Sequence, residues 1–76
     1  MLELRIIQHA LTLARVGNFG RAAESLGISQ PSLTRSIASL EASLGVKLFD
    51  RNRRGIKPTV FGAVFLAEGK VVFLAD

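Results

Sequence analysis

Apolar residues recur at helical spacing near the start of this chain. Within residues 4–16 they lie three or four positions apart, which is the pattern of a helix with one buried side. The recurring residues are Leu4, Ile7, Leu11 and Ala14. Gly17 follows directly, and glycine readily takes the left-handed conformation that ends a helix. The pattern predicts a first helix over residues 4–16 that buries this stripe.

A second, shorter helix is predicted after Asn18, whose side chain suits the N-cap position. Its apolar positions are Phe19, Ala22, Ala23 and Leu26. The alanines allow another helix to cross closely. The turn Gly27-Ile28-Ser29 comes next, with Ile28 directed into the core and Ser29 placed to cap a third helix. Pro31 is tolerated in that first turn because its missing N–H has no helical partner there.

The third helix has an unusual outer face. Its inward positions are Leu33, Ile37, Leu40 and Leu44, and the opposite face carries Pro31, Arg35, Ala38, Ser39 and Ala42, flanked by Ser32. Arg35 is the single charge on this short-chained face, whereas a solvated helix face usually mixes both signs. Two helices joined by such a short turn predict a helix-turn-helix, whose second helix enters the DNA major groove. The alternative is an ordinary serine- and alanine-rich surface.

Positive charge is concentrated after the third helix. Ten Lys and Arg against six Asp and Glu give a net charge of +4 and a pI near 10.8, which favours a polyanionic partner. Half of these cations lie within the eleven residues 47–57, which contain one acid, Asp50; they are Lys47, Arg51, Arg53, Arg54 and Lys57. Short apolar clusters on either side of the turn 52–55 predict a small hairpin. The layout is that of a winged helix-turn-helix, and the alternative is a solvated basic loop.

The last segment is apolar on nearly every side. Thr59 is placed to cap a helix that begins at Val60 and contains Phe61, Val64, Phe65, Ala67, Val71, Val72, Phe73 and Leu74. In so small a chain, we expect the far side of this helix to be buried by another molecule. A helix packed wholly into its own core is the alternative.

The composition argues against several function classes. The chain has no cysteine and a single histidine, His9, for which we expect a solvated surface position without metal or catalytic partners. Scattered acids and the lack of a glycine-rich phosphate loop argue against an enzyme, and we expect no cofactor and no metal. We also expect no signal peptide and no membrane span, and therefore a cytoplasmic protein.

Over residues 4–62 the chain resembles the N-terminal DNA-binding domain of LysR-type transcriptional regulators, most closely from residue 19 to residue 62. The matching segments include Gly17-Asn18-Phe19, Ala22-Ala23, Leu26, Ile28-Ser29-Gln30-Pro31-Ser32-Leu33-Thr34-Arg35, Ile37, Leu40-Glu41, Leu44-Gly45-Val46, Leu48-Phe49-Asp50-Arg51, Arg54-Gly55 and Thr59. The Ser-Gln-Pro start of the third helix, followed at this interval by Leu-Phe-x-Arg-x-x-Arg, is far more specific than a general helix-turn-helix pattern.

The resemblance implies a mainly helical fold: a winged helix-turn-helix over residues 1–58, with a three-helix core and a small hairpin, and the start of a linker and dimerisation helix over residues 59–76. It implies that Gln30, Pro31, Thr34 and Arg35 face bases or nearby backbone, that Ser29 and Ser32 meet phosphate, and that Arg51 and Arg54 belong to the wing. Chemistry agrees, because Gln suits adenine, Arg suits guanine, and serine hydroxyls suit phosphate.

Three positions depart from the family pattern. Ala10 stands where an aromatic residue is usual, so we expect Phe61 or Phe65 to fill the space beside it. Arg53 replaces a small turn residue and makes the wing more basic, so we include it among the DNA-binding residues. Pro58 replaces a common leucine and is expected to shorten the second wing strand.

The function predicted is sequence-specific binding of double-stranded promoter DNA for transcription regulation, by a homodimer or higher homo-oligomer. The predicted dimer contacts are Phe61, Phe65, Val72 and Phe73. We expect this chain to be the DNA-binding part of a longer regulator whose small-molecule effector binds a domain absent here. The rival prediction is a protein-interaction or dimerisation module that does not bind DNA.

Overall fold

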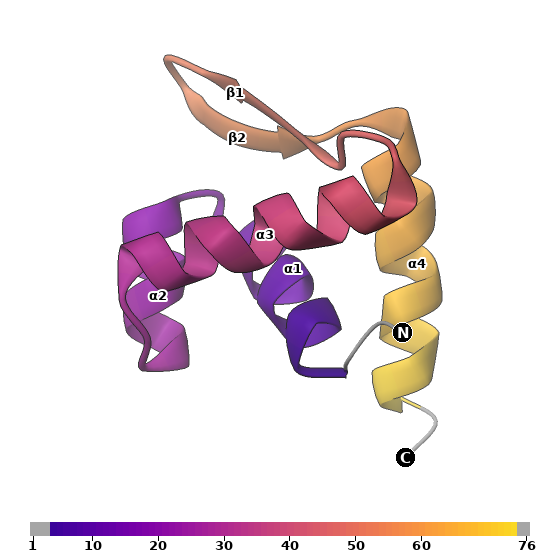
Figure 1. Ribbon diagram of the computed structural model, residues 1–76, viewed down its shortest axis with the longest axis horizontal. Coiled ribbons are helices and arrows are strands. Elements are labelled where there is room, and N and C mark those ends of the chain that lie inside the picture. The colour runs from indigo at the N-terminus through magenta and orange to yellow at the C-terminus, as the bar shows by residue number, and fades with distance from the viewer. Residues whose placement is uncertain (1–3, 75–76) are drawn as a thin grey trace.

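The chain folds into helices and one antiparallel hairpin, seen in a computed structural model that describes the backbone of residues 4–74 and the side chains of residues 4–68 (Figure 1). In chain order the elements are α1 (Leu4–Val16), α2 (Phe19–Leu26), α3 (Gln30–Leu44), β1 (Phe49–Asn52), β2 (Gly55–Pro58) and α4 (Val60–Leu74). The mainly helical winged helix-turn-helix predicted from the sequence is confirmed.

The corner between α2 and α3 forms as its residue types dictate. Asn18 caps α2 by accepting a hydrogen bond from the Arg21 amide at 2.9 Å. Gly27 ends α2 in the left-handed conformation, with φ +70°, and Ile28 donates its amide hydrogen to the Ala23 carbonyl at 3.0 Å. These bonds satisfy the backbone groups at the helix end, so the chain turns sharply and starts α3 three residues later.

The core lies where α1, α2 and α3 cross. Its buried residues are Ala10, Leu13, Phe19, Ala22, Ala23, Leu33, Ile37, Leu40, Leu48, Phe49 and Leu66. Both alanines of α2 are at most 3% exposed, so small residues lie where α2 meets its neighbours. Ile28 is partly buried and packs on this core from the turn, as predicted.

Two predicted core positions are wrong. Leu4 is 54% exposed, and the fully buried residues of α1 are Ala10 and Leu13. The helix is contacted by α2, α3 and α4, so its buried surface is broader than one stripe and is centred elsewhere. Leu44, at the end of α3, is 38% exposed, whereas the fully buried Leu48 completes the core after the turn.

The hairpin is attached to α3 by one carboxylate. Its strands pair in register from Phe49 opposite Pro58 to Asn52 opposite Gly55, so Pro58 stands at the end of β2 and interrupts no central pairing. The Glu41 carboxylate accepts hydrogen bonds from the amides of Leu48 at 2.7 Å and Phe49 at 3.3 Å. Two amides at the entrance to β1 are thereby satisfied, and this fixes where the hairpin leaves the helical core.

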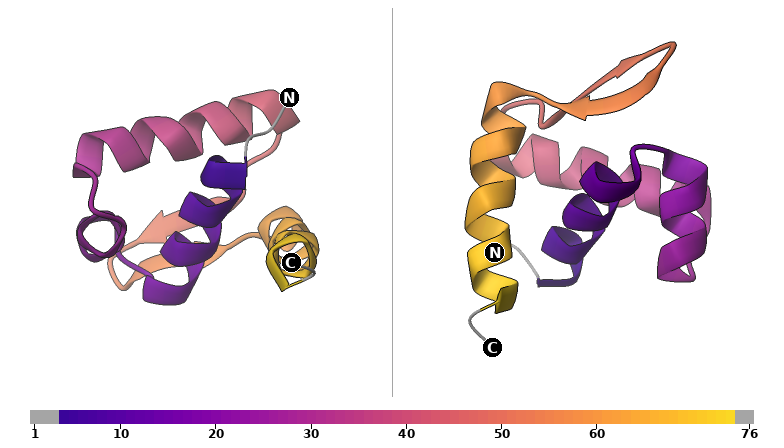
Figure 2. Two further views of the ribbon diagram at one scale, coloured as in Figure 1. Left: turned by 90° about the horizontal axis from the view of Figure 1, so that it is seen from below. Right: turned by 180° about the vertical axis from the view of Figure 1, so that it is seen from behind.

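The start of α4 is held against the chain that precedes β1. Thr59 donates its hydroxyl hydrogen to the Lys47 carbonyl at 2.6 Å and caps α4 by accepting from the Gly62 amide at 3.0 Å. A Cβ at Gly62 would overlap the Leu48 carbonyl, so only glycine allows this approach. As Figure 2 shows, α4 then runs along one side of the molecule, beside α1.

One side of α4 packs on the domain and another is open. Leu66 is buried and Phe65 packs partly on the core, whereas Val60, Phe61 and Val64 are 80%, 60% and 62% exposed. Of the two residues expected to fill the space beside Ala10, Phe65 therefore reaches the core. Phe61 does not, and that part of the prediction is wrong because its side chain lies on the open side of the helix.

Candidate nucleic-acid interface

The N-terminal turn of α3 carries a linked set of polar side chains. Ser29 caps α3 by accepting a hydrogen bond from the Ser32 amide at 3.2 Å, and its hydroxyl donates to Ser32 Oγ at 2.9 Å. An Arg35 guanidinium nitrogen donates to the same oxygen at 3.4 Å. Because Ser32 Oγ accepts from both neighbours, its own hydroxyl hydrogen remains to be donated, as a phosphate oxygen would require.

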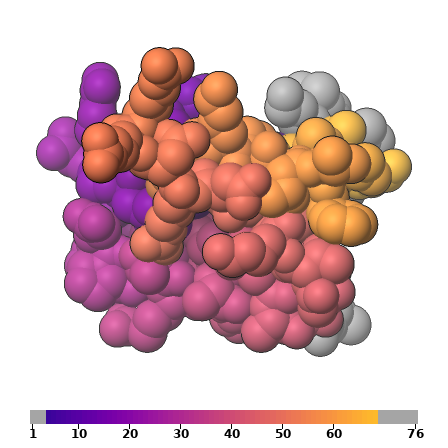
Figure 3. Space-filling view, turned by 90° about the horizontal axis from the view of Figure 1, so that it is seen from above, coloured from indigo at the N-terminus to yellow at the C-terminus, as the bar shows by residue number. Residues whose placement is uncertain are grey.

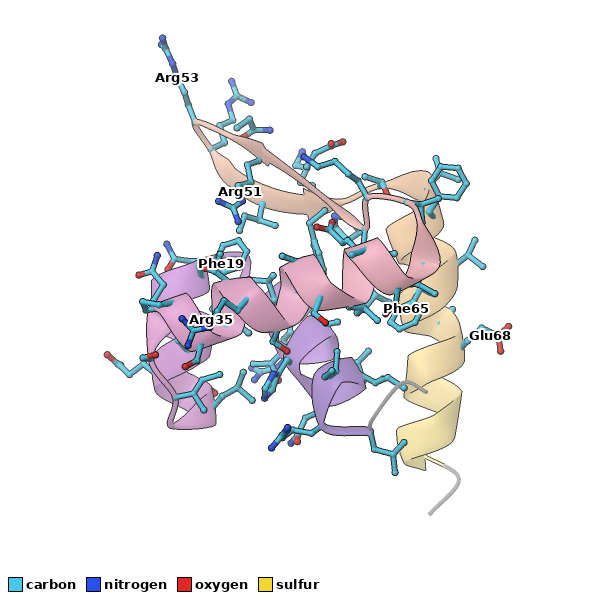
Figure 4. The ribbon with its side chains drawn as sticks, in the orientation of Figure 1. Phe19, Arg35, Arg51, Arg53, Phe65 and Glu68 are labelled. Atoms are coloured by element: carbon cyan, nitrogen blue, oxygen red, sulfur yellow. The ribbon has the colours of Figure 1, made fainter. Side chains whose placement is uncertain are left out.

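The residues predicted to face DNA bases share the start of α3. Gln30, Pro31 and Arg35 are exposed, and Thr34 is half-buried. Arg35 lies on the front of α3, near α2 (Figure 4). Beyond Arg35 the outward positions Ala38, Ser39 and Ala42 are exposed and short, so a bulky partner can approach the helix closely.

The hairpin extends the positive charge beyond α3. Arg51, Arg53 and Arg54 are all exposed, and Arg53 projects from the tip of the hairpin (Figure 4). The turn is closed by Asn52, whose side-chain oxygen accepts from the Arg54 amide at 2.8 Å. Seen from above, hairpin side chains stand out from the surface, and α4 lies at the other end of the molecule (Figure 3).

Arg51 differs from the two arginines of the turn. Its guanidinium carbon lies 4.4 Å from the centroid of the Phe19 ring, at the start of α2. A guanidinium over an aromatic face at this distance is a cation–π contact. The sequence predicts Arg51 in the wing but gives no sign of this contact, because no sequence spacing relates a strand residue to a helix more than thirty positions earlier.

The position of His9 differs from the solvated surface position expected from the sequence. Its ring is half-buried, and Nδ1 lies 2.8 Å from Ser36 Oγ, within hydrogen-bonding distance, so the histidine is not simply solvated. Burial and, to a smaller extent, the nearby charge of Arg5 lower the pKa of His9 below its usual value. A histidine on α1 therefore touches the helix that carries the predicted base contacts.

The predicted dimer contacts are only partly within the described side chains. Phe61 is exposed on α4. Phe65, labelled in Figure 4, is partly buried against this chain's own core. Val72 and Phe73 lie outside the side chains that the structure describes. Within the described residues, an open apolar surface on α4 is thus formed by Val60, Phe61 and Val64.

Two other kinds of site are absent from the described residues. They contain no group of three or more His, Cys, Asp or Glu that could hold a metal ion. None of the helices in that part of the chain has the length and apolar character needed to cross a membrane.

The fold and the arrangement of α2, α3 and the hairpin define a winged helix-turn-helix. Residues 4–63 match the family model described as bacterial regulatory helix-turn-helix protein, lysR family, and the chain belongs to this family. It is 44% identical over 69 residues to the HTH-type transcriptional regulator TfdT of Cupriavidus pinatubonensis, covering 91% of this chain and 30% of TfdT. The chain spans less than a third of the length of the curated relatives it matches, which are described as regulators or activators of transcription.

Comparison with solved structures supports the same family assignment. The crystal structure of a CbnR_DBD–DNA complex superposes with a TM-score of 0.91 at 38% identity, covering 97% of this chain and 85% of that one. A BenM_DBD complex with benA site 1 DNA gives a TM-score of 0.93 at 32% identity, covering 97% of this chain and 83% of that one. Both are DNA-binding domains in complex with DNA.

Proposed function

We propose that this chain binds double-stranded promoter DNA sequence-specifically and so regulates transcription. The observation that carries the proposal is the gathering of Arg35, Arg51 and Arg53 in the half of the molecule where α2, the start of α3 and the hairpin meet (Figure 4). This concentration of positive charge suits the phosphate backbone, and the short residues of α3 suit entry into the major groove. The likeness to DNA-bound CbnR_DBD and BenM_DBD supports it.

The roles proposed for the side chains follow from their chemistry. Gln30 suits bidentate hydrogen bonding to adenine, and Arg35 suits the same kind of bonding to guanine. Pro31 and Thr34 would face bases or the DNA backbone beside them. Ser29 and Ser32, at the N-terminus of α3, suit phosphate oxygens. The proposed backbone contacts are completed by Arg51, Arg53 and Arg54.

We further propose that the protein acts in the cytoplasm as a homodimer or higher homo-oligomer through α4, and that it is not an enzyme. Its relatives are described as transcriptional regulators, and their greater length leaves room for an effector-binding domain outside this chain. The open surface of Val60, Phe61 and Val64 favours self-association. The same surface is the reason to keep a protein-interaction module without DNA binding as the second candidate.

Fluorescence anisotropy with two labelled duplexes separates these candidates. One duplex is selected by the protein from a random pool, and the other has the same composition in scrambled order. We expect both to bind more weakly as salt rises, and the selected duplex to bind about a hundredfold or more tightly than its scrambled form, since each wrong base pair costs about 1–3 kcal/mol. Equal salt-dependent affinities would contradict sequence-specific binding, and no salt-dependent binding to either duplex would favour the protein-interaction module.

A further inference from the structure

A cleft lies along α3, between this helix and α1. It has a volume of about 390 Å³ and is lined mainly by Arg5 and His9 from α1 and by Ser32, Arg35, Ser36 and Ser39 from α3. Ser32 and Arg35 also belong to the proposed DNA-binding face, so the cleft is continuous with that face. None of the described residues that line it is acidic.

The cleft and the hairpin occupy different flanks of α3. Glu41 holds the start of β1, and Ser36 touches His9 of α1. Glu41 lies five positions after Ser36, which is about 140° around a helix that turns 100° per residue. Figure 1 agrees, because the hairpin lies above α3 and α1 lies below it.

Groove dimensions make both flanks relevant to DNA. A helix with its side chains is about 10–12 Å across, and the major groove is about 12 Å wide, so a helix inside the groove has a phosphate row close to each flank. The hairpin supplies cations at one flank. We propose that the cleft binds a backbone phosphate at the other rim of the groove, with Arg5 and His9 of α1 as its cationic side chains.

The contact with Ser36 suits His9 to this role. The Ser36 hydroxyl can donate to Nδ1 of the neutral ring or accept from Nδ1–H of the charged ring, so the ring keeps its place in both states. Nε2 is then the nitrogen that donates to a phosphate oxygen. Ser36 is a positioning residue, since it acts on the phosphate only through His9.

The charges around His9 determine whether DNA affinity rises or falls with pH. Among the described residues, the charged groups that line the cleft are Arg5 on α1 and Arg35 on α3, and the α2–α3 turn contributes the uncharged Ile28. Burial and Arg5 lower the pKa of His9, so the free chain favours the neutral ring. A phosphate in the cleft favours the charged ring and raises this pKa. Formation of the complex then takes up a proton, and DNA affinity rises as the pH falls from the pKa of His9 in the complex towards its lower pKa in the free chain.

The proposal rests on the proposed function and has its own direct test. His9 is the sole histidine of the chain, so its ring resonances are unambiguous in an NMR titration. The probes are a duplex bound by the wild type and, separately, inorganic phosphate at matched phosphate concentration. We expect the pKa of His9 to rise in the duplex complex and to move less with inorganic phosphate. An unchanged pKa in the complex, or an equal rise with both probes, would overturn the assignment to DNA.

Anisotropy on variants gives a second readout. Wild-type affinity is expected to increase on acidification by up to about tenfold for each unit by which DNA raises the pKa of His9. His9→Gln should lose this increase, and Ser36→Ala should weaken it. Arg5→Gln should lower affinity for every sequence, whereas the matched control Arg15→Gln, at the other end of α1, should not. If His9→Gln keeps the wild-type pH dependence, the cleft is not a phosphate site. Salt-dependent DNA binding would still support the proposed function in that case.

Discussion

The guanidinium of Arg51 stacks on the ring of Phe19, with 4.4 Å between the guanidinium carbon and the ring centroid. Arg51 lies in the first strand of the hairpin, and Phe19 is the first residue of α2, itself 8% exposed and part of the core. The contact therefore fastens the hairpin to the rigid part of the domain. The hairpin is short and two-stranded, and such hairpins are marginally stable alone, so this attachment matters for its orientation.

Arg51→Lys tests this relationship. Lysine keeps the charge and can itself lie over the ring, but its compact ammonium is more strongly hydrated than a guanidinium, so part of the contact's about 0.5–1 kcal/mol is expected to be lost. If that energy holds the hairpin in its DNA-binding position, affinity falls by up to about fivefold, and amide order parameters drop along the hairpin. The matched control is Arg53→Lys at the tip, which keeps its charge and is expected to bind like the wild type. Equal affinity of the two variants would show that the stacking does not position the hairpin.

Arg35→Ala should relax sequence preference more than it weakens non-specific binding. Arg35 is the single charged side chain centred on the outer face of α3, and a bidentate contact from arginine to guanine contributes about 1–3 kcal/mol of discrimination. The measurement is the ratio of affinities for the selected and scrambled duplexes. A wild-type ratio in the variant would make Arg35 a phosphate contact or a bystander.

The double substitution of Arg53 and Arg54 by alanine should act differently. Both side chains are exposed on the hairpin turn and suit the DNA backbone. Affinity for all sequences is expected to fall alike, and the slope of log affinity against log salt should decrease by about 0.9 for each phosphate that the variant no longer neutralises. Arg15→Ala is the control, because Arg15 is an arginine that lies in a groove between α1 and α4 and not on the hairpin turn. An unchanged slope would place the two hairpin arginines away from the duplex.

Gly62→Ala is expected to destabilise the fold. The new methyl group would overlap the Leu48 carbonyl, and backbone cannot yield as a side chain can. Overpacking of this kind costs about 1–3 kcal/mol. Gly20→Ala is the control, since a Cβ there meets side-chain oxygens at 3.4 Å and alanine favours the helix by up to about 1 kcal/mol. Thermal unfolding should therefore move the two midpoints in opposite directions, and a Gly62→Ala midpoint at or above that of the wild type would contradict the close approach.

The local signals of the sequence predict local structure well. Asn18, Ser29 and Thr59 cap the helices for which they are predicted, and Gly17, predicted to end the first helix, has the left-handed φ of +75°. Each of these signals depends on hydrogen bonds or backbone angles within a few residues, so the sequence contains all that is needed to recognise it.

Contacts between distant segments escape prediction for the opposite reason. The Glu41 carboxylate binds amides seven and eight residues later, and His9 meets a serine 27 positions away. The partners of each contact do not lie in one helix or strand, so no periodicity within an element relates them and a single sequence carries no signal of the contact. The buried side of α1 is mispredicted on the same grounds, because it is set by the helices that cross α1 and not by its own apolar repeat.

We expect the chain to self-associate through α4. Val60, Phe61 and Val64 form an open apolar surface, and monomeric proteins seldom leave such surfaces uncovered. A second copy related by a two-fold axis would cover it and would set two α3 helices on major-groove faces about 34 Å, or a multiple of it, apart. The selected duplex should then have two-fold symmetry.

Analytical ultracentrifugation measures the association directly. We expect wild type and Phe61→Leu to form dimers, because leucine keeps the surface apolar, and Phe61→Glu to sediment as a folded monomer, because a buried unpaired carboxylate opposes pairing. Phe65 is less suited to this test, since its partly buried side chain also supports the core. A wild-type chain that stays monomeric at high micromolar concentration, or a Phe61→Glu variant that still dimerises, would contradict an interface on this side of α4.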